Sequence, residues 1–427
     1  MKRNIGNLVI IASVILTVIV WFVFPPHNEG NDPTFVRRYA GEVLGSSVIV
    51  LLSFSLFLST RPKWAEPYFG GLDKMYMTHR RTSTVAFLLL FVHLLTVPIS
   101  ITDMRIGNYI AIVAFLGIVS IVLVTLAPRL PFLSKLLTGE TYDGWKRLHR
   151  FVGIFFILGF IHSLTVKALD ALIPITWVQM FFILGTVSYL YTEIFGRFFK
   201  KYVPYHVDAV KHPNPSTTEV TLRPRNTPIK KQRAGQFLFV HFPQDRILNE
   251  SHPFTISSAP HEDVLRVTIK ASGDFTRYLF HNLKADMSAV VEGAYGLFDY
   301  KTGGPRQVWI AGGIGVTPFL SFVRDMDGNL AHDVDFYYTV RHPEEAIFVE
   351  ELEAASLKNP RLKVHVRYSA KEGSLTVDHI LKSIRGDIKD YHIYLCGPLP
   401  MIQAFEKKFL DAGLPQNQIH YEEFNFR

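Results

Sequence analysis

The chain has 427 residues, of which 48% are hydrophobic, and 34 of them are phenylalanine. Its mean hydropathy of +0.17 is high for a soluble protein of this length. The single cysteine, Cys396, excludes an internal disulfide and a four-thiolate iron–sulfur cluster held by this chain alone. Much of the net charge of +8 lies in basic loops between apolar runs, so we do not expect nucleic-acid binding.

Six apolar segments before about residue 196 are long enough to cross a bilayer, since a membrane-spanning helix needs roughly 20 residues. They are Ile5–Phe24, Tyr39–Leu58, Thr82–Ser100, Tyr109–Leu126, Leu148–Val166 and Ile173–Phe195. The first lacks a small-residue cleavage site, so we expect a retained helix and not a signal peptide. Basic loops alternate with loops poorer in Lys and Arg, which predicts that both termini are cytoplasmic.

Two histidines accompany each of the third and fifth segments: His93 lies in the third segment and His79 just before it, and His149 and His162 lie in the fifth. Their spacings of 14 and 13 residues correspond to about 21 and 19.5 Å along a helix. The predicted topology places His79 and His149 at an inner level and the other two at an outer level. Ionisable residues are costly in a bilayer and are usually functional. A single buried histidine often bonds only to a neighbouring helix, but four in matched pairs favour two stacked bis-histidine haems, with other metals as the alternative.

The thirteen-residue spacing poses a geometric problem. Thirteen residues of regular helix turn a side chain about 140° from the starting face, whereas fourteen bring it to within about 40°. The fifth helix should therefore be distorted, and Gly153 and Gly159 are candidates for allowing that.

After about residue 200 the sequence changes to short strands separated by Gly and Pro. The stretches AGQFLFVHF, SHPFTISSAP, VLRVTIKASGDFTRYL and VVEGAYGLF predict a small antiparallel barrel. The later stretches QVWIAGGIGVTPFLSFV, VDFYYTVR, LKVHVRYS and YHIYLCGPLPMI alternate with helical segments, which indicates a parallel α/β domain. Glycines in GGIG allow close approach of a pyrophosphate to a helix N-terminus, although a plain strand-to-helix turn fits nearly as well.

The motifs HPFTISS, GDFT, AGGIGVTPF and CGP, in this order, resemble the flavin and nicotinamide domains of the ferredoxin-NADP reductase superfamily. With the paired histidines, residues 35–427 resemble the ferric reductase and NADPH oxidase family, most closely its compact bacterial NADPH oxidases. The resemblance implies a membrane all-α six-helix bundle over residues 1–200, an antiparallel β-barrel flavin domain over 201–303 and an α/β nucleotide-binding domain over 304–427. It also implies an integral protein of the bacterial plasma membrane with a cytoplasmic dehydrogenase domain.

The resemblance implies FAD contacts at the HPFT motif: Thr255 near the flavin edge, Phe254 along the isoalloxazine and His252 near a phosphate. Soluble relatives usually have Arg and Tyr where His252 and Phe254 stand, so we expect a weaker phosphate grip and a more exchangeable FAD. The GDFT residues would hold the pyrophosphate, or form an ordinary turn. The remaining flavin-binding residues that it implies are Pro253, Ser257, Gly273, Phe275 and Thr276.

The resemblance also implies a nicotinamide nucleotide site, with NADPH or NADH as the electron donor. Arg341 ends a strand and is a candidate for pairing with the 2′-phosphate of NADPH, or is a solvated arginine. The terminal YEEFNFR resembles the family's flavin-covering aromatic, for which the spacing selects Glu422 and Phe424, with Phe426 nearly as good. The residues lining the nucleotide would be Gly312, Gly313, Ile314, Gly315, Thr317, Pro318, Cys396, Gly397 and Pro398.

Together these parts imply a transmembrane oxidoreductase that moves electrons from NADPH through FAD and two b-type haems to an acceptor outside the membrane. Short outer loops favour O2 as the acceptor, with superoxide as the product. Arg38 is a candidate for attracting superoxide; alternatively, it contacts a lipid headgroup or a haem propionate. Phe155 and Phe156 lie midway between His149 and His162, either between the haems or packed elsewhere.

Other functions stay open at this point. A ferric chelate, a quinone or an extracytoplasmic protein are alternative acceptors. A non-redox haem sensor or transporter is the alternative of another class, but it would not need two nucleotide-type domains. The sequence contains no EF-hand loop or Pro-rich ligand segment. We therefore expect the lipid bilayer and an electron acceptor as partners, without an obligatory protein activator.

Overall fold

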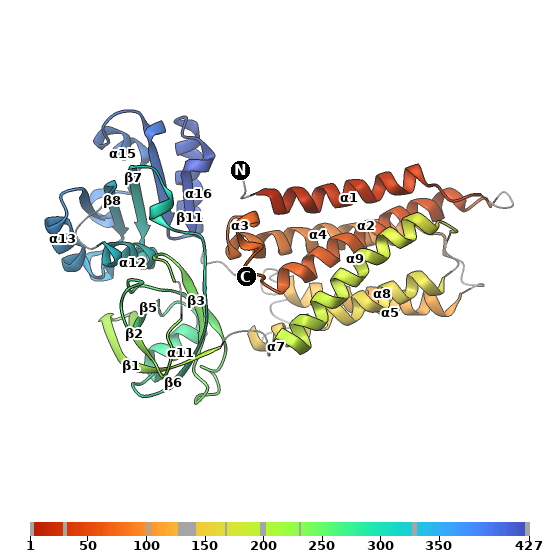
Figure 1. Cartoon of the computed structure of the whole chain (residues 1–427), viewed down its shortest axis with the longest axis horizontal. Coiled ribbons are helices and arrows are strands. Elements are labelled where there is room, and N and C mark those ends of the chain that lie inside the picture. The colour runs from red at the N-terminus through yellow and green to blue at the C-terminus, as the bar shows by residue number, and fades with distance from the viewer. Residues whose placement is uncertain are drawn as a thin grey trace. The chain divides into compact units, whose positions relative to one another are not determined.

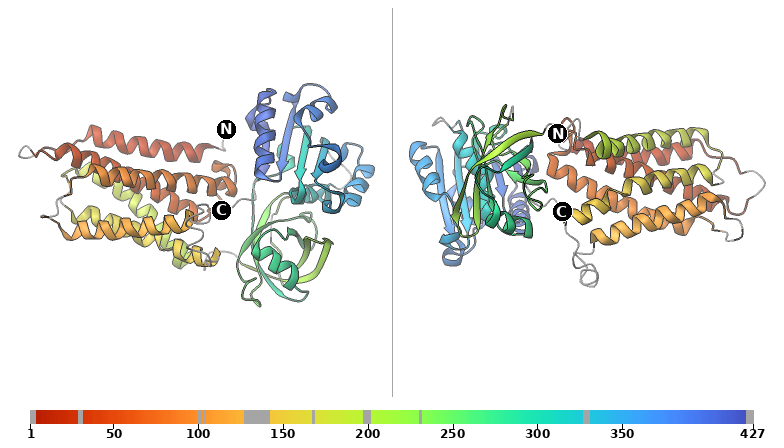
Figure 2. Two further views of the ribbon diagram at one scale, coloured as in Figure 1. Left: turned by 180° about the vertical axis from the view of Figure 1, so that it is seen from behind. Right: turned by 90° about the horizontal axis from the view of Figure 1, so that it is seen from below.

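The computed structural model describes residues 4–28, 32–99, 102, 104–126, 142–166, 169–196, 202–229, 232–326 and 331–422. The chain divides into two compact units, Met1–Lys200 and Lys201–Arg427. The first unit is helical, and the second contains two sheets with accompanying helices (Figures 1 and 2).

The helical unit is built on six long helices that run beside one another (Figure 2). They are α1 (Ile5–Val23), α2 (Phe35–Ser59), α4 (Leu72–Thr96), α5 (Ile106–Leu126), α8 (Val152–Thr165) and α9 (Leu172–Leu190), with the short helices α3 (Glu66–Phe69) and α7 (Tyr142–His149) and a π-helical end, η4 (Tyr191–Phe195). Within the described residues, five stretches are long and apolar enough to cross a membrane: α1, α2, α5, Arg147–Thr165 and Leu172–Phe195.

The third predicted span, in α4, differs most from the prediction. The helix runs from Leu72 to Thr96, whereas the apolar segment suggested Thr82–Ser100. Its first turns carry charges such as Asp73 and Arg80, so α4 is a helix of 25 residues whose apolar part is short, and it is not among the five apolar stretches named above. A helix can extend beyond the apolar run that lies in the membrane. The apolar run alone therefore predicted a start for α4 that is too late in the sequence.

The fifth predicted span is interrupted between α7 and α8. The N–H of Phe151 donates to the carbonyl of Leu148 over 3.0 Å, which is a tighter turn than an α-helix makes. The interruption precedes Gly153, where a Cβ would overlap the ring of Tyr189. A break in helical pitch therefore separates the two histidines of this span, as their thirteen-residue spacing requires, and Gly153 serves close packing.

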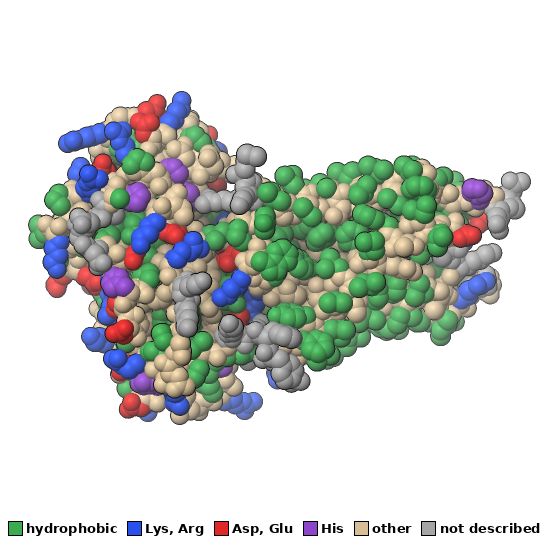
Figure 3. Space-filling view, viewed as in Figure 1, with side chains coloured by type: hydrophobic (Ala, Val, Ile, Leu, Met, Phe, Trp, Pro, Cys, Tyr) green, Lys and Arg blue, Asp and Glu red, His purple; other side chains and the backbone are tan. Residues whose placement is uncertain are grey.

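Helix α2 is central in the helical unit, where it packs against α1, α4 and α9. Its buried face is rich in small residues, which allow helices to approach closely in a membrane: Gly41, Ser46, Ser47, Ser53 and Ser55. By contrast, α8 packs on α5, and the described residues of α4 and α8 make little direct backbone contact. Hydrophobic side chains cover the visible face of the helical unit (Figure 3).

The second unit begins with a six-stranded antiparallel sheet in the order β4-β3-β6-β1-β2-β5. A bridge between Ile256 and Val267 joins the ends of this order, which closes the sheet into the predicted barrel. The elements are β1 (Val203–Asn214), β2 (Thr217–Pro224), β3 (Phe237–His241), β4 (His252–Thr255), β5 (Leu265–Lys270), α11 (Asp274–Asn282) and β6 (Ser288–Tyr295).

A five-stranded parallel sheet follows in the order β11-β10-β7-β8-β9, as the alternating pattern predicted. The chain adds β8 and β9 on one side of β7 and then β10 and β11 on the other, and ligands bind at the carboxyl ends of strands where the order reverses. The strands are β7 (Arg306–Gly312), β8 (Asp333–Val340), β9 (Leu362–Tyr368), β10 (Tyr391–Cys396) and β11 (Ile419–Glu422). The helices are α12 (Thr317–Asp325), α13 (Val349–Lys358), α14 (Ser369–Glu372), α15 (Val377–Ser383) and α16 (Leu399–Asp411).

Candidate functional site

The carboxyl edge of the parallel sheet gathers predicted nucleotide residues from separate strands. Gly312 ends β7, Cys396 ends β10 and Glu422 ends β11, while Arg341 directly follows β8. The reversal of strand order lies between β7 and β10, so the glycine turn and Cys396 are neighbours at the position where nucleotides bind in such sheets.

Close packing explains the glycines of this turn. A Cβ at Gly315 would overlap the carbonyl of Cys396, and one at Gly312 would lie 2.7 Å from the sulfur of Met401. Gly313 differs, since its φ is +56° and a Cβ there would meet open space. The hydroxyl of Thr317 donates to the carbonyl of Ile314 over 3.1 Å and closes the turn. The turn thus lies against β10 and leaves Gly313 open for a ligand to approach.

The remaining residues of this group occupy the end of β10. Gly397 has φ +158°, and a Cβ there would lie 3.1 Å from the backbone of Gly312, while Pro398 precedes α16. Cys396 is completely buried and pairs in register with Glu422. Burial, followed by the charge of Glu422, raises the pKa of the Cys396 thiol well above its usual value. The thiol is therefore neutral at physiological pH.

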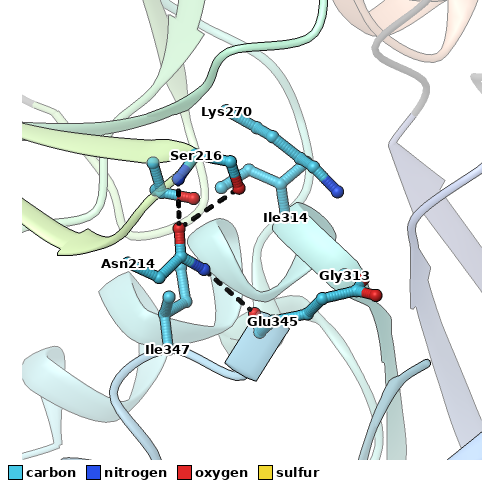
Figure 4. A pocket seen from close by; sticks show the side chains of 8 residues that line it. Asn214, Ser216, Lys270, Gly313, Ile314, Glu345 and Ile347 are labelled. Carbon is cyan, nitrogen blue, oxygen red and sulfur yellow. Dashed lines mark hydrogen bonds between the residues drawn. The ribbon is translucent and has the colours of Figure 1, made fainter. Parts of the chain in front are cut away.

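A small pocket with a volume of about 10 Å³ lies beside the glycine turn (Figure 4). Lys270, at the end of β5, lines it together with Gly313 and Ile314, which brings a cation next to the turn. Asn214 accepts from the N–H and hydroxyl of Ser216 and donates weakly, over 3.4 Å, to the carbonyl of Glu345. The pocket is thus built jointly by the barrel and the nucleotide domain, a contribution that the sequence analysis missed.

The two flavin motifs come together in the barrel. The ring of His252 lies 3.8 Å from that of Phe275, centre to centre, and Phe254 stacks on Phe275 at 6.5 Å. Pro253 pairs with Phe239 in the neighbouring strand. His252 Nε2 also lies 3.2 Å from a carboxylate oxygen of Glu250, so the residue predicted to approach a phosphate has an acid beside it.

The hydroxyl groups of the other predicted flavin residues differ in their hydrogen bonds. The hydroxyl of Thr255 is buried and has no hydrogen-bond partner among the described residues, so it is available to a flavin. Ser257 instead bonds to Thr268 over 3.0 Å inside the barrel. The hydroxyl of Thr276 accepts from the N–H of Gly273 over 2.9 Å, which caps α11 and occupies one of the groups expected to hold pyrophosphate.

In the helical unit, the rings of His79 and His149 are neighbours. Their centres are 6.2 Å apart and their planes make an angle of 74°. Two imidazoles bound to opposite sides of one metal, with bonds of about 2 Å, have centres roughly 6 Å apart. At this separation both imidazoles would be able to hold one haem iron between them.

Three of the four histidines are oriented by backbone carbonyls. Nδ1 of His79 donates to Ser55 over 2.9 Å, Nδ1 of His93 to Gly41 over 2.9 Å and Nδ1 of His162 to Gly107 over 3.0 Å. A histidine that donates from Nδ1 presents the lone pair of Nε2, which is how metal-binding histidines are commonly held. His149 is the exception, because its buried Nδ1 has no partner among the described residues, and its ring stacks on Trp145. The residues present fit haem ligation.

Further candidate residues of the helical unit have contacts with neighbouring residues. Phe155 packs against Gly117 of α5, and Phe156 stacks on Phe182 of α9. Arg38 makes an ion pair with Asp32 over 2.8 Å. Bonds from the hydroxyl and N–H of Thr34, and then from Arg38, lower the pKa of Asp32 to about 2. The guanidinium of Arg38 is thus paired with a carboxylate that stays ionised at neutral pH. Phe424 and Phe426 lie outside the described residues.

Three protein-family models match the chain in succession. They are described as a ferric reductase like transmembrane component over residues 44–160, an FAD-binding domain over 207–306 and an oxidoreductase NAD-binding domain over 309–407.

Curated relatives match the second unit. The ferredoxin reductase component of 3-ketosteroid-9-alpha-monooxygenase from Rhodococcus rhodochrous is 28% identical over 197 residues, which is 45% of this chain and 56% of that protein. Flavohemoprotein A from Dictyostelium discoideum is 25% identical over 214 residues, 46% of this chain and 53% of that protein. The chain thus spans about half the length of these relatives. A solved flavohemoglobin from Malassezia yamatoensis shares the fold with a TM-score of 0.54 and 17% identity, over 92% of this chain and 98% of its own.

The fold, the nucleotide edge and these matches define an electron-transfer oxidoreductase in which a transmembrane domain is joined to FAD- and NAD(P)-binding domains. These three domains in this order make up the domain architecture of the ferric reductase and NADPH oxidase family.

Proposed function

We propose that this chain moves electrons from cytosolic NADPH through FAD and two b-type haems, stacked across a bacterial plasma membrane, to O2 on the outer side, with superoxide as the product. The observation that carries this proposal is the pairing of His79 with His149 in a helical unit attached to FAD and nicotinamide nucleotide domains. The basic loops support a cytoplasmic location for both termini and the dehydrogenase domain.

The dehydrogenase residues support the first transfer. When bound, FAD takes two electrons from NADPH as a hydride and returns them one at a time. The hydroxyl of Thr255, which is buried without a partner among the described residues, would meet the flavin edge, and the open side of Gly313 would receive the dinucleotide phosphates. Arg341 directly follows β8 and is exposed. Its guanidinium would pair with the 2′-phosphate, the group that distinguishes NADPH from NADH, because guanidinium and phosphate make strong charge-assisted hydrogen bonds.

The membrane histidines support the second transfer. Haem iron accepts and gives single electrons when it is held by histidine. His79 and His149 would hold the inner haem, and His93 and His162 the outer one. Gly45 supports this arrangement, since a Cβ there would lie only 3.3 Å from the ring of His93.

The terminal acceptor is assigned from the outer side of the helical unit. Arg38 is a candidate for attracting superoxide there, and its guanidinium makes an ion pair with Asp32. The short loop at residues 97–105 leaves little chain for a wide chelate-binding cavity, which favours O2.

The test is NADPH oxidation by detergent-purified protein with added FAD in air, in which cytochrome c reduction is followed with and without superoxide dismutase. We expect dismutase to abolish the cytochrome c signal without any added protein. A signal that persists with dismutase, while haem is reduced, would assign a ferric chelate, a quinone or a protein as acceptor. Activity that required a protein partner would contradict the proposed constitutive action.

A further inference from the structure

Helix α12 contacts the barrel directly beyond its flavin motif. The hydroxyl of Ser321 donates to the carbonyl of Ser258 over 2.7 Å, and Nη1 of Arg324 donates to the carbonyl of Ser257 over 2.9 Å. Ser321 and Arg324 are three residues apart and share one face of the helix. Both carbonyls closely follow Thr255, so α12 holds the backbone that continues from the predicted flavin contact.

Arg324 also joins two acids from different domains. Its side chain is 9% exposed, and its Nε and Nη2 donate to the two carboxylate oxygens of Glu351 in α13 over 2.7 and 2.8 Å. Nη1 lies 3.4 Å from Oε1 of Glu219 in β2, whose side chain is also 9% exposed. A planar guanidinium can make these contacts together, whereas a lysine cannot. Arg324 thus joins the nucleotide domain to the barrel through Glu219, and both of these charged groups are shielded from water, whereas the side chain of Glu351 is 38% exposed.

The other end of α12 is the glycine turn. The helix has nine residues and is therefore about 13 Å long. Phe319, Leu320 and Phe322 are completely buried and fix the helix against its own domain. If this packed helix moves as one body, a change at Arg324 would displace the glycine turn relative to β4.

We propose that Arg324, acting through Glu219 and the carbonyl of Ser257, is a positioning residue that sets the separation between bound nicotinamide and flavin during hydride transfer. This inference rests on the proposed function. In that step, two electrons and one proton leave NADPH together and enter FAD, and the reacting atoms must approach to about 3–3.5 Å. A misplacement of about 1 Å can slow such a step by about 100-fold.

The test is the rate of flavin reduction in anaerobic stopped flow, with full-length protein, FAD and saturating NADPH. Glu219→Gln removes the charge that faces Arg324 and keeps the size of the side chain, and Ser321→Ala removes the second contact. Arg361→Gln is the matched control, because Arg361 makes an exposed ion pair with Asp333 at 3.9 Å in the same domain.

We expect flavin reduction to slow by about 10- to 100-fold in Glu219→Gln and by a smaller factor in Ser321→Ala. The FAD content and the NADP+ dissociation constant should stay within about threefold, because neither residue belongs to the predicted binding sets. The isotope effect with 4-deuterated NADPH should increase, which a loss of folded protein would not produce.

Three outcomes would overturn the inference. The first is a rate of flavin reduction within twofold of wild type in both variants. The second is an equal slowing of flavin reduction in Arg361→Gln. The third is a slowing that parallels the loss of FAD while the isotope effect stays unchanged. If Glu219→Gln does not fold, Ser321→Ala decides by the same criteria. A wild-type protein whose flavin is not reduced by NADPH would instead overturn the proposed function, and this inference with it.

Discussion

The rings of His79 and His149 lie 6.2 Å apart on two helices that otherwise make little direct contact within the described residues. Their surroundings differ. Nδ1 of His79 bonds to the carbonyl of Ser55, whereas the ring of His149 is held by stacking on Trp145 at the end of α7. The chain thus supplies one ligand from a continuous helix and one from a helix that is interrupted immediately after it.

Removal of His149 should therefore remove one haem. We expect His149→Ala to lower the haem content of purified protein from about two to about one per chain, because the bond from this imidazole has no substitute in the described structure. The pyridine haemochrome assay measures this ratio. His27→Ala is the control, since His27 is exposed outside the long helices. Equal haem content in the two variants would contradict the assignment.

The buried hydroxyl of Thr255 should contribute to FAD affinity. Thr255→Val keeps the shape and removes the group, and a hydrogen bond contributes about 1 kcal/mol, which corresponds to a roughly fivefold weaker FAD dissociation constant. Fluorescence titration of FAD measures the change. Thr268→Val is the comparison, because Thr268 bonds to Ser257 and should affect stability more than FAD affinity. The opposite pattern would show that Thr255 does not meet the flavin.

Much of the fold could be predicted because its patterns are local. Apolar runs predicted the long helices, alternation predicted the barrel, and strand–glycine–helix order predicted the parallel sheet. The start of α4 was missed, since charges such as Arg80 hide a helix that continues past the apolar run. The thirteen-residue spacing from His149 to His162 did indicate a distortion, but not that it lies at Phe151.

Contacts between distant residues could not be predicted. Glu219 and Arg324 are separated by 105 positions, and no local pattern relates them. The same holds for Lys270, which reaches the pocket beside the glycine turn from the barrel. The ion pair of Arg38 with Asp32 is different, because an acid six residues from a cation is a signal that the sequence itself contains.

Gly315 should be required for nucleotide binding. In Gly315→Ala the new methyl group would overlap the carbonyl of Cys396, and such overpacking costs about 1–3 kcal/mol. We expect NADPH-driven flavin reduction at subsaturating NADPH to fall by about tenfold or more, with FAD still bound. In Gly313→Ala space is available, and only backbone strain of about 1–2 kcal/mol should remain. Equal or reversed effects in stopped-flow measurements would contradict the packing described for this turn.

The thiol of Cys396 should stay protonated at a pH at which an exposed thiol ionises. Its pKa is raised by burial and by Glu422, so the native thiol remains neutral while the thiol of the unfolded chain, with a pKa of about 8.5, loses its proton. The free energy of unfolding should therefore decrease above about pH 8.5. Alkylation by iodoacetamide, measured by mass spectrometry at this single cysteine, becomes faster once the thiol ionises. We expect this increase to occur at a higher pH in native protein than in unfolded protein. Coincident pH profiles would show that the thiol is exposed.

The most direct test of the account is anaerobic addition of NADPH to purified protein containing FAD, with the haem absorption bands followed in time. We expect two haems per chain, reduced after the flavin, and reoxidised when oxygen is admitted. Protein without haem absorption, or haem that stays oxidised while the flavin is reduced, would contradict an electron path from the nucleotide edge at Gly312 to the histidine pairs of the helical unit.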